Sequence, residues 1–192
     1  MLKDIILKNR SYRSFNKARK IQQGEILEII ETVRKCPSAR NKQPLKYMVC
    51  TSDSDCEKLL SLTGFAGALK PLVLPPKGHE PTAYVIICTD NSICPEGTNR
   101  FLEVDIGIAA QSFMLLLAEK ELGGCMLGAF DQTKISEALN IPEKYIPRLI
   151  LAIGEPDETV VLEDSEDGDI SYYRKEDGIH RVPKRKLEDI II

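Results

Sequence analysis

The sequence predicts one domain of the mixed α/β class, built on a central sheet. Runs with helical spacing alternate along the chain with short runs typical of strands, which is the pattern of layered α/β folds. The 192 residues suit a single domain spanning 1–192. With glycine counted in place of tyrosine, the 43% hydrophobic content becomes about 46%, as in folded globular chains. Disordered and collagen-like structures are therefore excluded.

Two helices and a loop are predicted first. A helical stripe that begins at Leu2 gives way to the polar segment 9–15. Glu25–Cys36 repeats the helical spacing of apolar residues, and Pro37 ends it. The polar residues 37–44 then form a loop.

Two β-rich runs, Tyr47–Cys50 and Ala83–Cys88, are predicted strands because turn-forming residues bound them. The segment 64–82 between them carries seven glycine or proline residues, too many for one regular element. We expect an irregular cap or lid there.

A long helix is predicted from Glu103 to Leu122, with apolar residues on nearly every side. Such a helix is buried on all sides or lies in a subunit interface. Gly123 and Gly124 are expected to end it.

The remaining core elements are two strands and a helix. Cys125–Leu127 and Arg148–Ile153 are the predicted strands, and Asp131 is placed to cap a helix through Leu139. The tail, 157–192, combines an acidic run, a basic group and three terminal isoleucines, so it is interpreted as an arm that packs on a neighbouring subunit.

Charge and composition exclude several classes of function. The net charge of -3 supplies no general attraction to nucleic acid. The longest apolar stretch, Ile106–Ala118, is too short to span a bilayer, and the charged N-terminus lacks a secretory signal, so a cytoplasmic location is expected. Six cysteines without a CxxC pair predict reduced thiols and neither a metal site nor disulfides. Cys125 is the one cysteine that lies within a candidate functional motif, the segment 122–131.

Positive charge is concentrated at the N-terminus, where residues 1–20 hold seven Lys or Arg against one acid. Arg10, Ser11 and Arg13 offer the donors that a phosphate or a planar carbonyl requires. A solvated basic helix end is the equally weighted alternative.

The loop 37–44 is a second candidate. Ser38 and Ala39 are small enough for close backbone approach to a flat ligand, and Asn41 has a donor and an acceptor for an imide edge like that of a flavin. A plain helix-to-strand connection explains the loop as well.

These clusters, taken with three further motifs and the tail, resemble the FMN-dependent nitroreductase family. The resemblance covers nearly the whole chain in the right order. The motifs are DIGIAAQS (105–112), LGGCMLGAFD (122–131), LAIGEPDE (151–158) and PKRKLEDIII (183–192).

The resemblance implies specific roles at the cofactor. Arg10 and Ser11 match the residues that hold the FMN phosphate, and Lys184 and Lys186 match the C-terminal pair that contacts it. Arg13 matches the basic residue beside N1 and O2 of the isoalloxazine ring, where a guanidinium stabilises the charge that reduction creates.

Two further stretches match residues that lie along the ring. The first comprises Ser38, Ala39 and Asn41, in the loop that the family takes from the second subunit. The second comprises Leu127, Gly128 and Ala129, at a strand end that faces flavin N5. Some family members have a glutamate where Gly128 stands, so the identity of the electron donor stays open.

The implied fold is a central, mostly antiparallel sheet flanked by helices, in an intertwined homodimer with an extended C-terminal arm and two FMN at the interface. The implied activity is ping-pong transfer of hydride from NADH or NADPH, through flavin N5, to a small electron acceptor such as a nitroaromatic, quinone or activated alkene. No side chain acts as nucleophile. His79 and His180 are interpreted as standing apart from the site, and Phe65 as a packing residue or a gate over the flavin.

Three alternatives stay open. One is a specialised FMN reaction such as reductive dehalogenation, decided by pocket residues in 64–82. Another is a flavin-storing or redox-sensing protein without efficient turnover. The third is a reductase fed by a separate ferredoxin.

Overall fold

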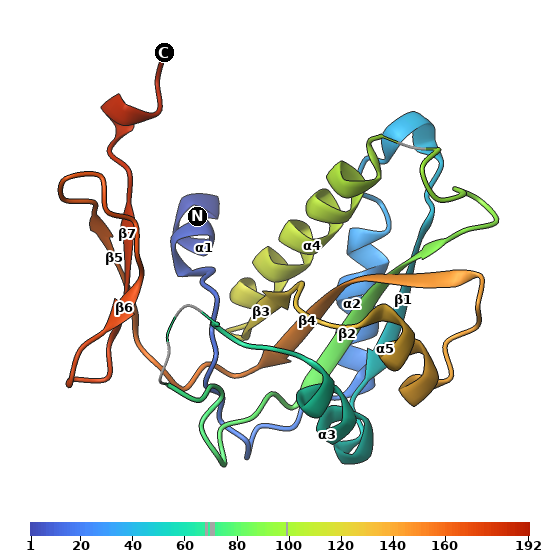
Figure 1. Cartoon of the computed structure of the whole chain (residues 1–192), viewed down its shortest axis with the longest axis horizontal. Coiled ribbons are helices and arrows are strands. Elements are labelled where there is room, and N and C mark those ends of the chain that lie inside the picture. The colour runs from blue at the N-terminus through green and yellow to red at the C-terminus, as the bar shows by residue number, and fades with distance from the viewer. Residues whose placement is uncertain (68, 70–71, 99) are drawn as a thin grey trace.

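The computed structural model describes residues 1–67, 69, 72–98 and 100–192 (Figure 1). Its main sheet has four strands in the order β1-β2-β4-β3. All three neighbouring pairs are antiparallel, so the predicted mixed α/β class with an antiparallel sheet is confirmed. The strands are β1 (Leu45–Cys50), β2 (Ala83–Asp90), β3 (Gly123–Leu127) and β4 (Tyr145–Gly154).

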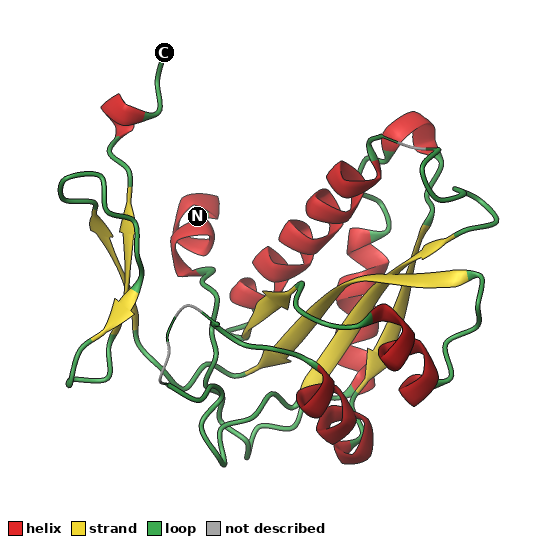
Figure 2. Cartoon of the chain, viewed as in Figure 1, coloured by secondary structure: helices red, strands yellow, loops and turns green. Residues whose placement is uncertain are grey.

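Helices cover both faces of this sheet (Figure 2). Alternate residues of β2 point to opposite faces, as the period of a strand requires. Val85 packs with α2 (Gln23–Val33) and α4 (Leu102–Glu119), whereas Ile86 packs with α3 (Asp53–Leu62) and α5 (Gln132–Leu139). All eight residues of β2 are buried, which places this strand in the middle of a three-layer core.

The long helix α4 confirms the prediction of a central helix. Nine of its residues are buried, and five of them belong to the core cluster shared with α2 and the sheet: Ala109, Ala110, Phe113, Met114 and Leu117. Its N-terminal turn is different, because Val104 is 54% exposed. α5 also begins as predicted, since Asp131 Oδ1 accepts hydrogen bonds from the backbone N–H groups of Thr133 and Lys134.

Gly123 and Gly124 do not end the helix, so that prediction is wrong. Both lie in β3, and α4 ends earlier, at Glu119. A Cβ on Gly124 would come within 2.2 Å of the Ala152 carbonyl oxygen, and one on Gly123 within 2.5 Å of the Tyr12 ring. Each glycine therefore lets a neighbouring segment approach closely: the loop with Tyr12 approaches Gly123, and β4 approaches Gly124.

α3 was not expected from the sequence. Ser52 caps it, because its hydroxyl oxygen accepts a hydrogen bond from the Asp55 backbone N–H at 3.1 Å. Only Cys56 and Leu59 of this helix are buried. The apolar stripe of this helix is therefore weak. The Ser-x-x-Asp spacing at its start, which is typical of helix N-termini, is the sequence signal that could have predicted it.

The described residues of the segment 64–82, which leave out 68, 70 and 71, form turns and bends and include neither a helix nor a strand. A lid function for it stays a prediction. Phe65 packs against the core cluster under α3 and α5.

The C-terminal tail carries its own small sheet, which stands beside α1 (Leu2–Lys8) and apart from the main sheet (Figure 1). β7 (His180–Lys184) is central, parallel to β5 (Val160–Asp164) and antiparallel to β6 (Tyr173–Arg174). Short 3₁₀ turns occur at Ala39–Asn41 and Leu187–Asp189. None of the helices in the described ranges is long and apolar enough to cross a bilayer.

Candidate functional site

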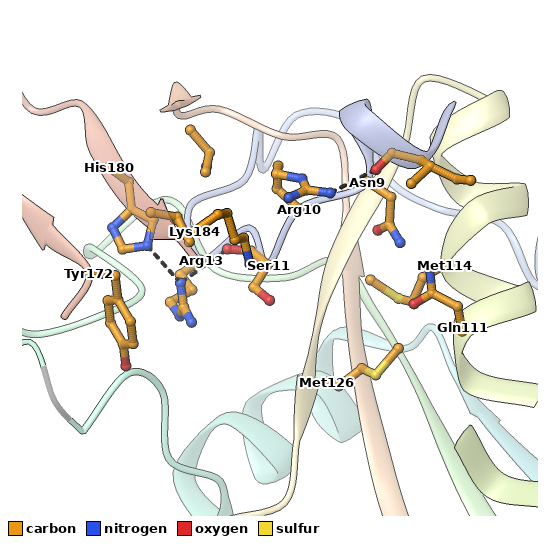
Figure 3. A pocket seen from close by; sticks show the side chains of 13 residues that line it. Asn9, Arg10, Ser11, Arg13, Gln111, Met114, Met126, Tyr172, His180 and Lys184 are labelled. Atoms are coloured by element: carbon orange, nitrogen blue, oxygen red, sulfur yellow. Dashed lines mark hydrogen bonds between the residues drawn. The ribbon is translucent and has the colours of Figure 1, made fainter. Parts of the chain in front are cut away.

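A cavity of about 390 Å³ opens where the small sheet faces α1, α4 and the end of β3 (Figure 3). Such a volume suits a small organic ligand. Residues from five elements, the loop after α1 and the loop before β6 line it: Ile6, Asn9, Arg10, Ser11, Arg13, Gln111, Met114, Met126, Val160, Tyr172, His180, Val182 and Lys184.

The cavity is cationic on one side and apolar on the other. Arg10, Arg13 and Lys184 contribute three positive charges, and the described lining residues include no acid. Met114 and Met126 supply polarizable apolar surface. The arrangement favours a ligand with an anionic group and a flat or apolar body.

Two guanidinium nitrogens support this interpretation. Arg10 Nε and Arg13 Nε are buried, and the described part of the chain gives neither one a hydrogen-bond acceptor. Buried donors are normally paired with protein, water or ligand. An oxyanion in the cavity would supply such an acceptor, so the residues present fit a phosphate-bearing ligand.

The loop that carries Arg10, Ser11 and Arg13 is anchored to the sheet. The Tyr12 backbone N–H donates to the Gly124 carbonyl at 2.9 Å, and Gly123 leaves room for the Tyr12 ring, which a Cβ there would meet at 2.5 Å. The Tyr12 hydroxyl donates to the Lys8 carbonyl at the end of α1, and burial raises the pKa of that phenol. Through Tyr12, the loop is therefore tied both to β3 and to the end of α1.

A buried carboxylate secures the same loop from the tail. The Glu158 side chain is 4% exposed. It accepts hydrogen bonds from the backbone N–H groups of Arg13 and Ser14, the latter at 3.1 Å, and forms an ion pair with Arg174. Glu158 thus links the basic loop to β6.

The Arg13 side chain lies over Cys125 of β3. Burial raises the pKa of the Cys125 thiol, and the positive charge of Arg13 partly opposes this. The thiol therefore stays neutral at physiological pH, which favours packing over nucleophilic chemistry for Cys125.

Ser38 and Ala39 lie at a different place, near the start of α4. Asp105, which is 3% exposed, accepts from the Ala39 backbone N–H at 2.8 Å and from the Ser38 hydroxyl at 3.2 Å. Arg40 and Asn41 have φ angles of 54° and 53°, a left-handed conformation that the surrounding contacts must hold. Within one chain this loop does not line the cationic cavity.

The remaining predicted residues are not among the residues that line the cavity. Leu127 is buried toward α3 and α5, whereas the preceding residue, Met126, lines the cavity. A Cβ on Gly128 would meet nothing within 4 Å, and the Ala129 carbonyl accepts from the Gly64 N–H. Lys186 is exposed and outside the described lining.

Sequence reasoning missed several cavity residues. The interpretation of His180 as standing apart from the site is wrong, because His180 is 1% exposed and contacts Arg13. Tyr172 and Gln111 also line the cavity. No local signal marks His180 or Tyr172, since both meet Arg13 only through the fold of the tail. His79 is half exposed and pairs with Asp157 at 2.7 Å.

Comparison with known proteins agrees with this fold. Residues 6–155 match the model of the nitroreductase family. YdgI of Bacillus subtilis (strain 168), named "Putative NAD(P)H nitroreductase", is 22% identical over 181 residues, which cover 79% of this chain and 87% of YdgI.

Solved structures share the fold. A nitroreductase family protein from Streptococcus pneumoniae TIGR4 superimposes with a TM-score of 0.72 at 18% identity, covering 100% of this chain and 99% of that one. A "putative nitroreductase in complex with FMN" from Exiguobacterium sibiricum 255-15 gives a TM-score of 0.65 at 18% identity, over 82% and 89% of the two chains. Because the family model spans most of its length, this chain belongs to the nitroreductase family.

Proposed function

We propose that the chain is an FMN-dependent oxidoreductase that uses NADH or NADPH to reduce a small electron-poor acceptor, such as a nitroaromatic or a quinone. The oxidoreductase class rests on the family and on the name of the relative YdgI. The observation that carries the assignment to this chain is the cavity with three cations, apolar methionines and no acid among its described lining residues.

The cavity residues divide naturally between the two parts of FMN. Arg10, Ser11 and Lys184 would bind the phosphate, whose charge near -2 matches the cations. Arg13 would face the N1–C2=O edge of the ring, and Met126 would pack beside it. When bound, FMN supplies the redox chemistry by accepting two electrons from the nicotinamide and passing them to the acceptor. No protein nucleophile is needed.

A second subunit would complete the site. In the loop with Ser38, Ala39 and Asn41, the first two residues are hydrogen-bonded to Asp105, and the loop is outside the cavity lining of its own chain. We propose a homodimer in which this loop reaches the partner's FMN, with Asn41 at the pyrimidine edge. The strand end at Leu127, Gly128 and Ala129 would lie along the ring, where Gly128 leaves open space.

Lys184 and Lys186 provide a test of the phosphate site. Lys184→Ala is expected to weaken FMN binding roughly tenfold, because it removes one charge-assisted contact, and added salt should shrink the difference. Lys186 lies outside the described lining, so Lys186→Ala should cost less unless the partner subunit brings it to the phosphate. Fluorescence titration of both variants at two salt concentrations measures this. Equal, wild-type affinity in both would remove the lysines from the phosphate site.

The proposed activity is tested by anaerobic stopped-flow mixing of the FMN-loaded protein with NADH and with NADPH. We expect at least one coenzyme to bleach the flavin absorbance, and a nitroaromatic or quinone to restore it. If neither coenzyme reduced the flavin, the chain would be a flavin-storing protein or would depend on a separate electron donor, and the reductase proposal would fail.

A further inference from the structure

The guanidinium of Arg13 is held by neutral groups. Its Nη1 donates to the Ser11 carbonyl at 3.1 Å and lies 3.2 Å from His180 Nε2 (Figure 3). The carbon at the centre of the guanidinium lies 5.4 Å from the centre of the Tyr172 ring. No carboxylate in the described ranges forms an ion pair with this side chain, since Glu158 pairs with Arg174.

The contact determines the chemical state of His180. Every guanidinium nitrogen of arginine is a donor, so Nε2 of His180 must be the acceptor. The imidazole is then neutral, with its hydrogen on Nδ1, a buried nitrogen that has no hydrogen-bond partner among the described residues. Burial and the nearby charges of Arg13 and Arg174 agree with this, because they lower the pKa of His180 to about 4.

The surroundings of His180 hold the ring in place. It begins β7, and its backbone N–H donates to the Thr159 carbonyl at 2.9 Å. The Tyr172 ring meets it edge-on, with the two ring centres 5.4 Å apart. A side chain that is 1% exposed and packed in this way keeps one orientation.

We propose that His180 is a positioning residue that holds the Arg13 guanidinium at the cavity while leaving its positive charge unneutralised for the ligand. A carboxylate at this place would also hold Arg13, but its negative charge would oppose the field of the guanidinium at the cavity. A neutral acceptor orients the guanidinium without that cost. This inference rests on the proposed function for the identity of the ligand, FMN.

Three variants at one position separate orientation from charge. His180→Gln keeps a neutral acceptor near the place of Nε2, His180→Leu removes the acceptor, and His180→Glu supplies a negative one. The readout is the midpoint potential of bound FMN, because Arg13 is expected to stabilise the electron-rich reduced ring. We expect the potential to stay near the wild-type value in His180→Gln and to fall in His180→Leu and most strongly in His180→Glu. For His180→Glu, the affinity for reduced FMN should drop roughly tenfold more than that for oxidised FMN.

A second measurement does not depend on FMN. Nitrogen NMR of the protein as purified should show a neutral His180 with its hydrogen on Nδ1 across the neutral pH range. In Arg13→Gln, the pKa of His180 should move up from about 4 toward its usual value near 6.5. A charged imidazole at neutral pH, or an unchanged pKa in Arg13→Gln, would overturn the pairing even if the substitutions at 180 fail to fold.

The outcomes distinguish this inference from the proposed function. If the wild-type protein does not bind FMN, the proposed function fails, and the NMR measurement alone decides whether His180 holds Arg13. If the wild-type protein binds FMN but His180→Glu has the wild-type potential, the positioning role is wrong while the FMN assignment stands.

Discussion

Arg13→Gln is expected to lower the midpoint potential of bound FMN and to slow its reduction by NADH or NADPH roughly hundredfold. Removing one fixed donor from the place where charge develops typically has an effect of this size. Among the described residues no carboxylate pairs with the Arg13 guanidinium, because Glu158, which accepts from the Arg13 backbone N–H, pairs with Arg174. The guanidinium charge is therefore available to the cavity. The potential is measured by equilibrium redox titration, and the rate by stopped-flow absorbance under anaerobic conditions.

Arg13→Lys is the matched control. It keeps the positive charge but loses the planar guanidinium, whose Nη1 contacts both the Ser11 carbonyl and His180 Nε2. The potential should therefore lie between those of the wild type and Arg13→Gln. A potential that is the same in all three proteins would place Arg13 away from the flavin ring.

Glu158→Ala is expected to lower the free energy of unfolding by about 3 to 5 kcal/mol, the usual result of removing one partner of a buried ion pair. The change leaves the Arg174 guanidinium and the backbone N–H groups of Arg13 and Ser14 without their acceptor. Urea denaturation followed by circular dichroism measures the loss. The same substitution should also weaken FMN binding, because Glu158 links the basic loop to the tail.

Glu176→Ala serves as the reference for Glu158→Ala. Glu176 is an exposed acid in the same tail, and surface substitutions of this kind usually change stability by less than about 0.5 kcal/mol. If the two variants unfolded at the same urea concentration, Glu158 would not be the residue that secures the loop.

Local patterns predicted most of the main sheet and its helices. The strands β1 to β4 and the helix α5 carry either short apolar runs or a clear capping residue such as Asp131. Two errors show the limit of such patterns. α3 has only two buried residues, so its stripe was too weak, and Gly123 and Gly124 serve tertiary close approach that resembles a helix end in sequence.

The candidate site was predictable in part. Arg10, Ser11, Arg13 and Lys184 come together in one cavity, as the resemblance implies. His180 could not be assigned, because its role depends on a contact with a residue 167 positions away. Long-range pairing of this kind is set by how the small sheet packs beside α1, which no local pattern records.

A titration of the cofactor-free protein with FMN and with riboflavin shows whether the cationic cavity holds FMN by its phosphate. The two ligands share the ring and differ only in the phosphate. Two or more charge-assisted contacts from Arg10, Ser11 and Lys184 predict that FMN binds roughly a hundredfold more tightly than riboflavin, with saturation near one FMN per chain. Equal affinities for the two ligands, or no binding of either, would mean that the cavity is not the phosphate site of FMN.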